Sequence, residues 1–205
     1  MFSVVIRTKT PTRAMNKKLK NRIEELVKEE ISVVPYNPAW PKMFKAEAAF
    51  LREKLPRNLV KRIEHFGSTA VPGLSAKPVI DILVEVANLK ETKKQIVPLL
   101  MAEGYEYFWR PAIGDQPPYY AWFIKRNVAG HRTHHIHMVE ADSELWDRLC
   151  FRDYLRQFPE EMKRYDKLKR SLAGKYPNDR VAYTKQKSDF VVSVTKKAKR
   201  HYKAN

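Results

Sequence analysis

The sequence has very little cysteine and no long apolar run. Cys150 is the only cysteine among the 205 residues. A single cysteine excludes an internal disulfide and a zinc site built from cysteines, and it favours a reducing compartment. No apolar stretch approaches the roughly 20 residues that a membrane-spanning helix needs. These absences predict a cytoplasmic protein that makes no membrane contact, and they leave its oligomeric state open.

Acidic residues are also scarce relative to basic ones. Asp and Glu total 23 against 40 Lys and Arg, which gives a net charge of +17. Hydrophobic residues make up 43% of the chain and aromatic residues 11%, which excludes a wholly disordered protein. The segments 1–21 and 196–205 contain Lys and Arg but no acid. Basic ends fit contact with nucleic acid or a solvated surface, although no RNA- or DNA-binding motif is present.

A basic extension is expected before the main domain. Residues 14–31 predict a helix whose basic half precedes its acidic half, an order that opposes the helix dipole. The apolar stretch 2–6 is too short for a signal-peptide core, and a transit peptide is the alternative interpretation. The prolines after residue 34 then force an extended path. We therefore expect an extension over 1–32, a main domain over 33–195 and a basic tail over 196–205.

Strand patterns occupy the middle of the chain and helical patterns occupy both ends. This order predicts an α+β fold, a mixed sheet backed by helices. Helices are expected over 42–55, 91–103, 143–157, 160–174 and 180–200, and strands over 60–66, 79–86, 105–110, 119–125 and 132–140. Pro98 predicts a kink in the helix over 91–103, and Gly104 predicts the end of that helix. Ser143 is expected to cap the helix over 143–157.

The loop after the first expected strand carries the clearest chemical signal. Gly67 and Ser68 end that strand, and Asp81 interrupts the apolar run of the next one. Glycine lets a backbone approach phosphate closely, and serine adds a hydroxyl and an N–H donor. Asp81 could hold a magnesium ion. The alternative is a tight loop in which Asp81 caps a local turn.

Histidines cluster on the last expected strand. His135 and His137 point to one face, while His134 points to the other with apolar neighbours. We hypothesise that His135 and His137 face Asp81 across the sheet. They could bind phosphate, act as acid or base, or join Asp81 on zinc or manganese. The alternative is two histidines satisfied by neighbouring hydrogen bonds.

Basic residues near these motifs are candidates for binding an anion. Lys77 precedes Asp81, and Arg110 ends an aromatic stretch. Lys187 shares a helix face with Tyr183 and therefore either points into the site or lies over apolar surface. Aromatic side chains at 109, 119, 120 and 122 could stack on a base or belong to the core.

Several motifs together resemble the GrpB family. They are HFGSTAVPGL at 65–74, AKPVIDI at 76–82, VPYNPAW at 34–40, THHIH at 133–137 and YTKQKSDF at 183–190. The resemblance covers roughly residues 33–194. Related domains also occur fused behind some dephospho-CoA kinases.

The resemblance implies a nucleotidyltransferase-like fold. Members of that superfamily carry Gly-Ser, a spacer, and then Asp-x-Asp on a strand. Gly67, Ser68 and Asp81 match this pattern, whereas Leu83 stands where the second acid is expected. Glu85 lies about 13 Å along the strand from Asp81 and cannot replace that acid.

The activity implied by the resemblance is transfer of a nucleotidyl group from a nucleotide, or chemistry on another phosphorylated small molecule, with magnesium. The alternatives are a non-catalytic module that binds a ligand, a protein or RNA, and a metal-dependent phosphate-ester hydrolase. The expected catalytic residues are Asp81, His135 and His137, with Asp81 also the expected metal ligand. The expected ligand-binding residues are Gly67, Ser68, Thr69, Lys77, Arg110 and Lys187.

Overall fold

The computed structural model describes residues 31–113 and 116–203. The transit-peptide alternative and the helix expected over 14–31, apart from its last residue, lie outside these residues. Within the described ranges, no helix is long and apolar enough to cross a membrane.

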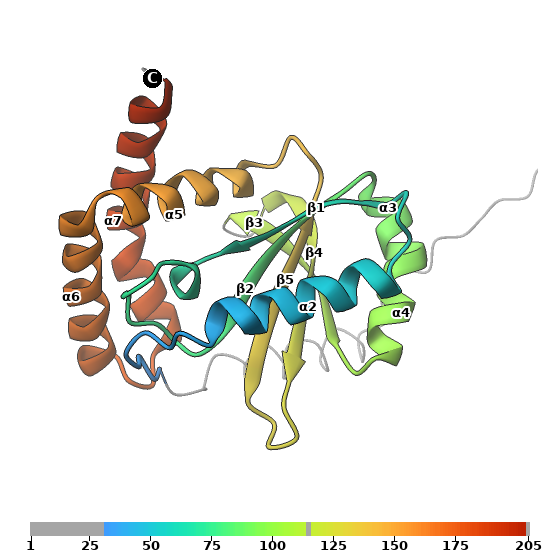
Figure 1. Cartoon of the computed structure of the whole chain (residues 1–205), viewed down its shortest axis with the longest axis horizontal. Coiled ribbons are helices and arrows are strands. Elements are labelled where there is room, and N and C mark those ends of the chain that lie inside the picture. The colour runs from blue at the N-terminus through green and yellow to red at the C-terminus, as the bar shows by residue number, and fades with distance from the viewer. Residues whose placement is uncertain (1–30, 114–115, 204–205) are drawn as a thin grey trace, which may run out of the picture.

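A mixed sheet forms the centre of the described chain (Figure 1). Its strand order is β1-β2-β5-β4-β3. The strands are β1 (Val60–Phe66), β2 (Ile80–Val86), β3 (Glu106–Ile113), β4 (Gln116–Arg126) and β5 (Arg132–Val139). The central strands β2 and β5 are parallel, and the other neighbouring pairs are antiparallel.

Helices lie on both sides of this sheet. They are α2 (Trp40–Lys54), α3 (Leu89–Glu91), α4 (Val97–Ala102), α5 (Asp147–Gln157), α6 (Pro159–Lys175) and α7 (Arg180–Lys203). Figure 1 shows α2 in front of the sheet and α5, α6 and α7 grouped on the left. The expected α+β fold, a mixed sheet backed by helices, is confirmed, including its helical C-terminal part.

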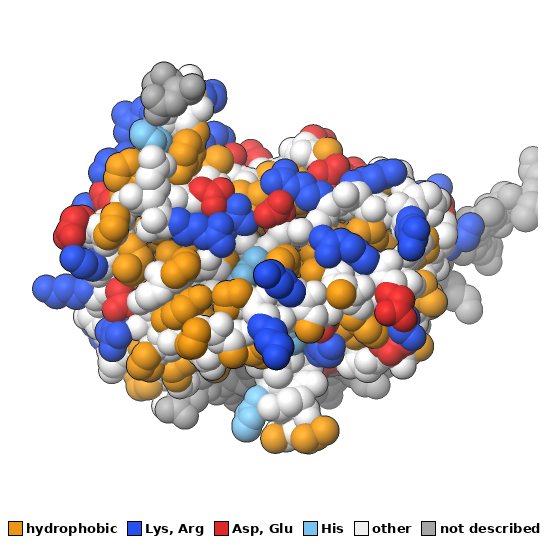
Figure 2. Space-filling view, in the orientation of Figure 1, with side chains coloured by type: hydrophobic (Ala, Val, Ile, Leu, Met, Phe, Trp, Pro, Cys, Tyr) orange, Lys and Arg blue, Asp and Glu red, His pale blue; other side chains and the backbone are white. Residues whose placement is uncertain are grey.

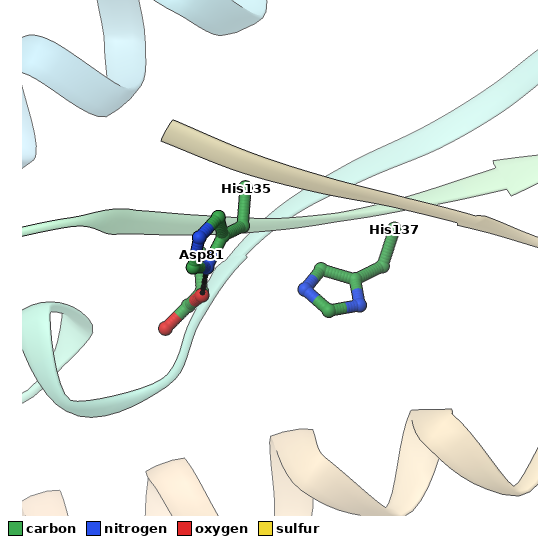
Figure 3. A group of neighbouring side chains, drawn as sticks. All are labelled: Asp81, His135 and His137. Atoms are coloured by element: carbon green, nitrogen blue, oxygen red, sulfur yellow. Dashed lines mark hydrogen bonds and ion pairs between the residues drawn. The ribbon is translucent and has the colours of Figure 1, made fainter. Parts of the chain in front are cut away.

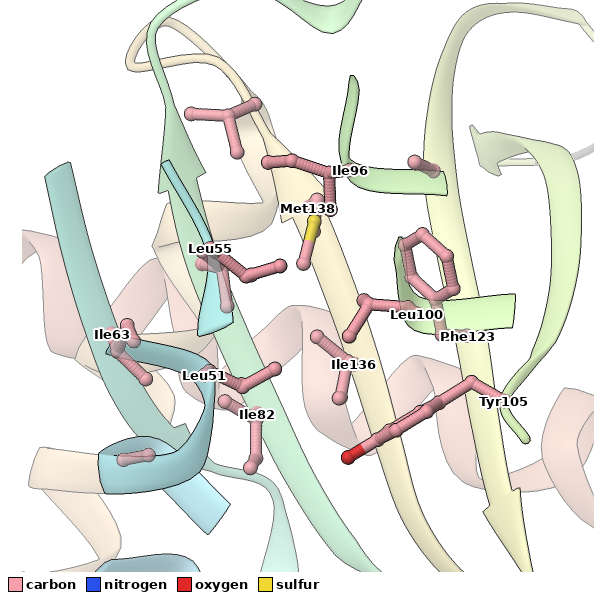
Figure 4. Close-up of a cluster of buried hydrophobic side chains, with 14 of the residues drawn as sticks. Leu51, Leu55, Ile63, Ile82, Ile96, Leu100, Tyr105, Phe123, Ile136 and Met138 are labelled. Carbon is pink, nitrogen blue, oxygen red and sulfur yellow. The ribbon is translucent and has the colours of Figure 1, made fainter. Parts of the chain in front are cut away.

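The main core lies between one face of the sheet and helices α2 and α4 (Figure 4). Alternation along β2 and β5 sends Ile82 and Ile136 to this face, where Leu51 and Leu100 cover them. These side chains are fully buried. Asp81 and His135 consequently point to the opposite face.

The helical segment before β3 differs from the single kinked helix that was expected. It begins at Leu89 and passes through a π-helical turn (Thr92–Ile96) before Pro98 in the first turn of α4. A π-turn shifts the hydrogen-bond pattern locally, and proline supplies no backbone donor. Gly104 follows the end of α4 with a φ of +84°, as expected for a residue that terminates a helix.

The last described residues, 196–203, pack against other helices. Residues 196–203, expected to be a basic tail, continue α7. Lys197 forms an ion pair with Glu161 at 2.5 Å, and Lys199 forms one with Asp147 at 2.7 Å. These pairs hold the end of α7 against α6 and α5.

Candidate functional site

Asp81 and His135 lie side by side on the central strands. They are register partners in the parallel pair of β2 and β5. Asp81 Oδ1 is 3.1 Å from His135 Nδ1, as the dashed line in Figure 3 shows. The Asp81 side chain keeps 30% of its surface exposed, whereas that of His135 keeps 9%. The structure thus brings together two residues that are 54 positions apart in the chain.

His137 completes a group of three on the same face. It is the register partner of Leu83, two residues after Asp81. Its Nδ1 is 2.9 Å from the hydroxyl oxygen of Tyr120. Figure 3 shows the other ring nitrogen turned toward Asp81. One potential ligand atom from each of Asp81, His135 and His137 lies within 4.8 Å of the other two.

Burial sets the charges of this group. Burial would raise the pKa of Asp81, but the hydrogen bond with His135 and nearby positive charge hold it below its usual value. Burial lowers the pKa of His137 to about 3, and it lowers the pKa of His135 although Asp81 opposes that shift. Near neutral pH the group therefore has one anionic carboxylate and two neutral imidazoles.

Gly67 is needed for the position of the Asp81 carboxylate. Its φ is +71°, which favours glycine. A Cβ atom at this position would lie 2.4 Å from Asp81 Oδ2. The motif was interpreted as a backbone that approaches phosphate. The structure adds a second reason for glycine, because only a residue without a side chain leaves room for the carboxylate.

The next two motif residues contact protein groups. Ser68 is half-buried, and its side chain opposes the rise that burial causes in the pKa of Tyr165 on α6. Thr69 is buried, its hydroxyl lies 3.0 Å from His65 Nε2, and it donates to the carbonyl of Val79 at 3.5 Å. These contacts engage the Thr69 side chain inside the protein, so its expected ligand contact would involve its backbone.

Two expected lysines approach the group from different segments. Lys77 Nζ lies 5.6 Å and Lys187 Nζ 5.0 Å from the centre of the Tyr183 ring. Burial and neighbouring positive charges lower the pKa of Lys77 to about 7. Burial lowers the pKa of Lys187 to about 8. The carboxylate of Asp81 opposes both shifts, so both ammonium groups lie within its electrostatic reach.

The C-terminal helices add basic residues that the sequence analysis missed. The charge of Arg148 on α5 acts on His137 and Lys187, and that of Arg180 on α7 acts on His135 and Lys77. Neither arginine stands in a distinctive motif. Only the packing of α5 and α7 against the site distinguishes them from the other basic residues of the chain.

Arg110 lies on the same face at the far side of the sheet. Its guanidinium is 4.8 Å from the Trp122 ring centre, and its charge acts on His137. Tyr120 and Trp122 are buried in an apolar cluster on this face, which supports the core interpretation of these aromatics over base stacking. Trp109 has the opposite strand parity and points to the other face.

Arginines of α5 hold the loop that contains Gly67. Arg152 Nη1 donates to the carbonyl of His65 at 2.7 Å. Arg156 donates twice to the carbonyl of Ala70, from Nε at 2.9 Å and from Nη2 at 2.7 Å. These bonds join the helical layer to both ends of the Gly-Ser turn, another feature that the sequence analysis missed.

The donor set fits magnesium poorly. Magnesium prefers oxygen ligands and is usually held by carboxylates together with phosphates. Among the described residues Asp81 is the only carboxylate in this group of three, and Leu83 is fully buried in the apolar cluster of this face. Two of the three donors are imidazoles, which suit transition metals better. The expectation of magnesium at Asp81 stays a prediction, and we derive no reaction step from it.

Comparison with known proteins identifies relatives over most of the chain. A family model described as GrpB protein matches residues 30–197. The glutamate-rich protein GrpB of Alkalihalophilus pseudofirmus is 38% identical over 165 residues, which span 80% of this chain and 93% of that protein.

A solved structure and a kinase extend this comparison. The crystal structure of the conserved protein GrpB from Enterococcus faecalis matches with a TM-score of 0.71 and 32% identity, covering 83% of this chain and 99% of that one. A dephospho-CoA kinase of Mycolicibacterium paratuberculosis is 34% identical over 87 residues, which span 40% of this chain and 20% of the kinase. That match agrees with the expected relation to a domain fused to such kinases. On the family match and these relatives, the chain belongs to the GrpB family.

Proposed function

We propose that this protein binds a nucleotide or another phosphorylated small molecule between the face of Asp81, His135 and His137 and the helices α5–α7. The observation that carries the proposal is the convergence of basic side chains around a single carboxylate. Lys77 and Lys187 lie within electrostatic reach of Asp81, and Arg148 and Arg180 act on the neighbouring groups. An excess of cations around one acid favours a ligand with several negative charges.

Each part of the site has a role in this proposal. The turn at Gly67 and Ser68 brings backbone N–H groups to a phosphate, and Arg152 and Arg156 hold that turn in place. Lys77 and Lys187 neutralise phosphate oxygens. A neutral His137 could donate or accept a proton, because its other nitrogen is oriented by Tyr120.

Nucleotidyl transfer is the chemistry that the match of Gly67, Ser68 and Asp81 supports. A specific observation favours a non-catalytic binding module instead, namely Leu83 at the position of the second acid. Asp81→Asn separates the two. An enzyme should lose turnover, whereas a binding module assayed without metal should keep its affinity for phosphate or gain some, because a negative charge is removed.

Nucleic acid remains a proposed partner of the basic surface. Lys and Arg side chains spread across the face in Figure 2, with Asp and Glu between them. Lys197 and Lys199 are paired with acids on α6 and α5, so part of the C-terminal charge is already engaged. Binding that depends on the basic surface should weaken steeply with added salt.

A thermal-shift screen tests the proposed ligand class. The panel contains nucleotides, coenzyme A precursors and short RNA, each with and without magnesium, manganese and zinc. A ligand at one hundred times its dissociation constant stabilises the folded state by about 2.7 kcal/mol. We expect a nucleotide or precursor to raise the melting temperature of the wild type and to raise that of Lys187→Met much less.

Lys185→Met is the matched control, because Lys185 is exposed on the same helix. It should keep the full shift. The absence of any shift with phosphorylated small molecules, or an equal loss in both variants, would contradict the proposal. A salt-sensitive shift with RNA alone would favour the nucleic-acid partner.

A further inference from the structure

Leu83, which stands where a second acid was expected, has His137 as its register partner on β5. Asp81 and Leu83 are successive residues on the site face of β2, and their register partners on β5 are His135 and His137. An imidazole therefore stands on the neighbouring strand at the level where a second carboxylate is expected. Two aspartates would offer only oxygen ligands on this face, whereas Asp81, His135 and His137 offer one carboxylate and two imidazole nitrogens.

The rings are placed so that they could coordinate one ion. The contact of His137 Nδ1 with Tyr120 leaves Nε2 as the nitrogen that faces Asp81 (Figure 3). A hydrogen bond at the remote nitrogen is the usual support of a metal-binding histidine. Two donors on one tetrahedral zinc ion lie about 3.3 Å apart, since each bond is about 2.0–2.1 Å long. The observed distance from Asp81 Oδ1 to His135 Nδ1 is 3.1 Å.

The positive charges near Asp81 disfavour a metal ion, such as magnesium, whose binding depends mainly on electrostatic attraction to carboxylates. Lys77 and Lys187 act on Asp81 and weaken its attraction for magnesium, which has no second carboxylate here. Bonds from imidazole to zinc tolerate such surroundings better, because nitrogen ligands suit zinc and not magnesium.

We infer that Asp81, His135 and His137 bind a single zinc-class transition-metal ion, with an open coordination position toward α5–α7. Three protein ligands and one open position are typical of catalytic zinc sites, in which the open position binds water or substrate. This inference deepens the proposed function, because a phosphate oxygen of the proposed ligand would occupy that position. Metal binding itself requires no nucleotide and can be tested alone.

The test is calorimetric titration of metal-stripped, full-length protein with Zn²⁺ and, separately, with Mg²⁺. We expect one zinc ion per chain and an affinity at least about tenfold above that for magnesium. Co²⁺ in place of zinc should give the visible absorption of a four-coordinate ion with nitrogen ligands. Equal affinity for the two metals, or no zinc binding, would overturn the inference without any variant.

Variants locate the ion. His137→Ala and His135→Ala should each lower zinc affinity by at least about tenfold. His131→Ala is the matched control, because His131 is an exposed histidine of the hairpin before β5 and should leave the affinity unchanged. Circular dichroism checks that each variant is folded. His137→Asp gives a second test, since an added carboxylate should shift the preference from zinc toward magnesium. Loss of zinc affinity in His131→Ala alone would place the ion elsewhere.

Failure of this inference and failure of the proposed function give different results. A phosphate-dependent thermal shift without zinc binding would overturn only the metal site. Zinc binding without any shift by phosphorylated ligands would support the metal site and contradict the proposed ligand class.

Discussion

One face of the central strands packs apolar side chains into the main core, whereas the opposite face holds ionisable side chains at partly buried positions. Ile82 and Ile136 represent the first face, and Asp81 and His135 the second. The four residues are neighbours on β2 and β5, so the contrast arises from strand alternation alone. Burying ionisable groups costs free energy, and a protein retains them where they serve a ligand or a reaction.

Individual buried polar groups on the two faces differ in their hydrogen bonding. Glu47 is buried on the core side, where it accepts hydrogen bonds from Tyr105 and, at 2.6 Å, from Lys125. His135 Nε2 on the site side is buried without a hydrogen-bond partner among the described residues. Glu47 is thus a structural link in the core, whereas His135 Nε2, like His134 Nε2 on the core side, has no hydrogen-bond partner in the described part of the chain.

Neighbouring substitutions should separate the two faces most clearly. Ile82→Ala should reduce the free energy of unfolding by about 2–5 kcal/mol, because it opens a cavity in the main core. The adjacent Asp81→Asn should change stability much less and should instead reduce zinc affinity. Urea denaturation and zinc titration of both variants check this contrast. A larger loss of stability in Asp81→Asn than in Ile82→Ala would contradict it.

Loss of the Glu47 hydrogen bonds on the core face should have the next largest effect on the free energy of unfolding. Glu47→Ala leaves Tyr105 and Lys125 without their partner, so we expect a loss of about 1–3 kcal/mol in the free energy of unfolding. Glu53 is exposed on the same helix, and Glu53→Ala should stay within about 0.5 kcal/mol of the wild type. Similar losses in both variants would show that the Glu47 link contributes little.

Gly67→Ala tests the geometry of the site face. With a φ of +71° and a ψ of −172°, Gly67 lies in a region that is essentially restricted to glycine, so an alanine there should cost about 1–3 kcal/mol, and its Cβ would displace the Asp81 carboxylate. Gly130→Ala is the control, because Gly130 has a φ of +81° and no atom near the position of an added Cβ. Both variants should lose some stability because of their positive φ, but only Gly67→Ala should lose affinity for zinc and phosphate. Unchanged ligand affinity in Gly67→Ala would contradict the assigned role.

The two lysines predict a pH dependence of ligand binding. Lys77 has a pKa of about 7 and Lys187 of about 8, so each is charged below that value and neutral above it. Affinity for a phosphorylated ligand should therefore fall as the pH rises from 6 to 9. If binding raises one of these pKa values by one unit, the loss is about tenfold. Calorimetry across this range measures it, and Lys77→Met should flatten the lower part of the profile. An affinity that rises with pH would contradict the role of both lysines.

Much of the fold was predictable because its signals are local. The local residue pattern located β1 at the observed residues and β2, which is rich in β-branched residues, within one residue. The π-turn before Pro98 was not predictable, because the apolar spacing of residues 91–103 is compatible with an ordinary helix. A helix was expected to residue 200, but the packing of its basic end was missed, since a run of lysines does not reveal that Lys197 and Lys199 have acidic partners on other helices.

The sequence by itself determined which residues are candidates for a functional site and which strand face each one occupies. Period-two alternation assigns Asp81, His135 and His137 to the faces away from their apolar neighbours, and this depends only on adjacent residues. Only the tertiary structure decided that β2 and β5 pair with Asp81 opposite His135. It also decided that the side chains of Arg148, Arg152 and Arg180 lie near this site. Strand register and helix packing depend on contacts between residues far apart in the chain, and no local pattern records those contacts.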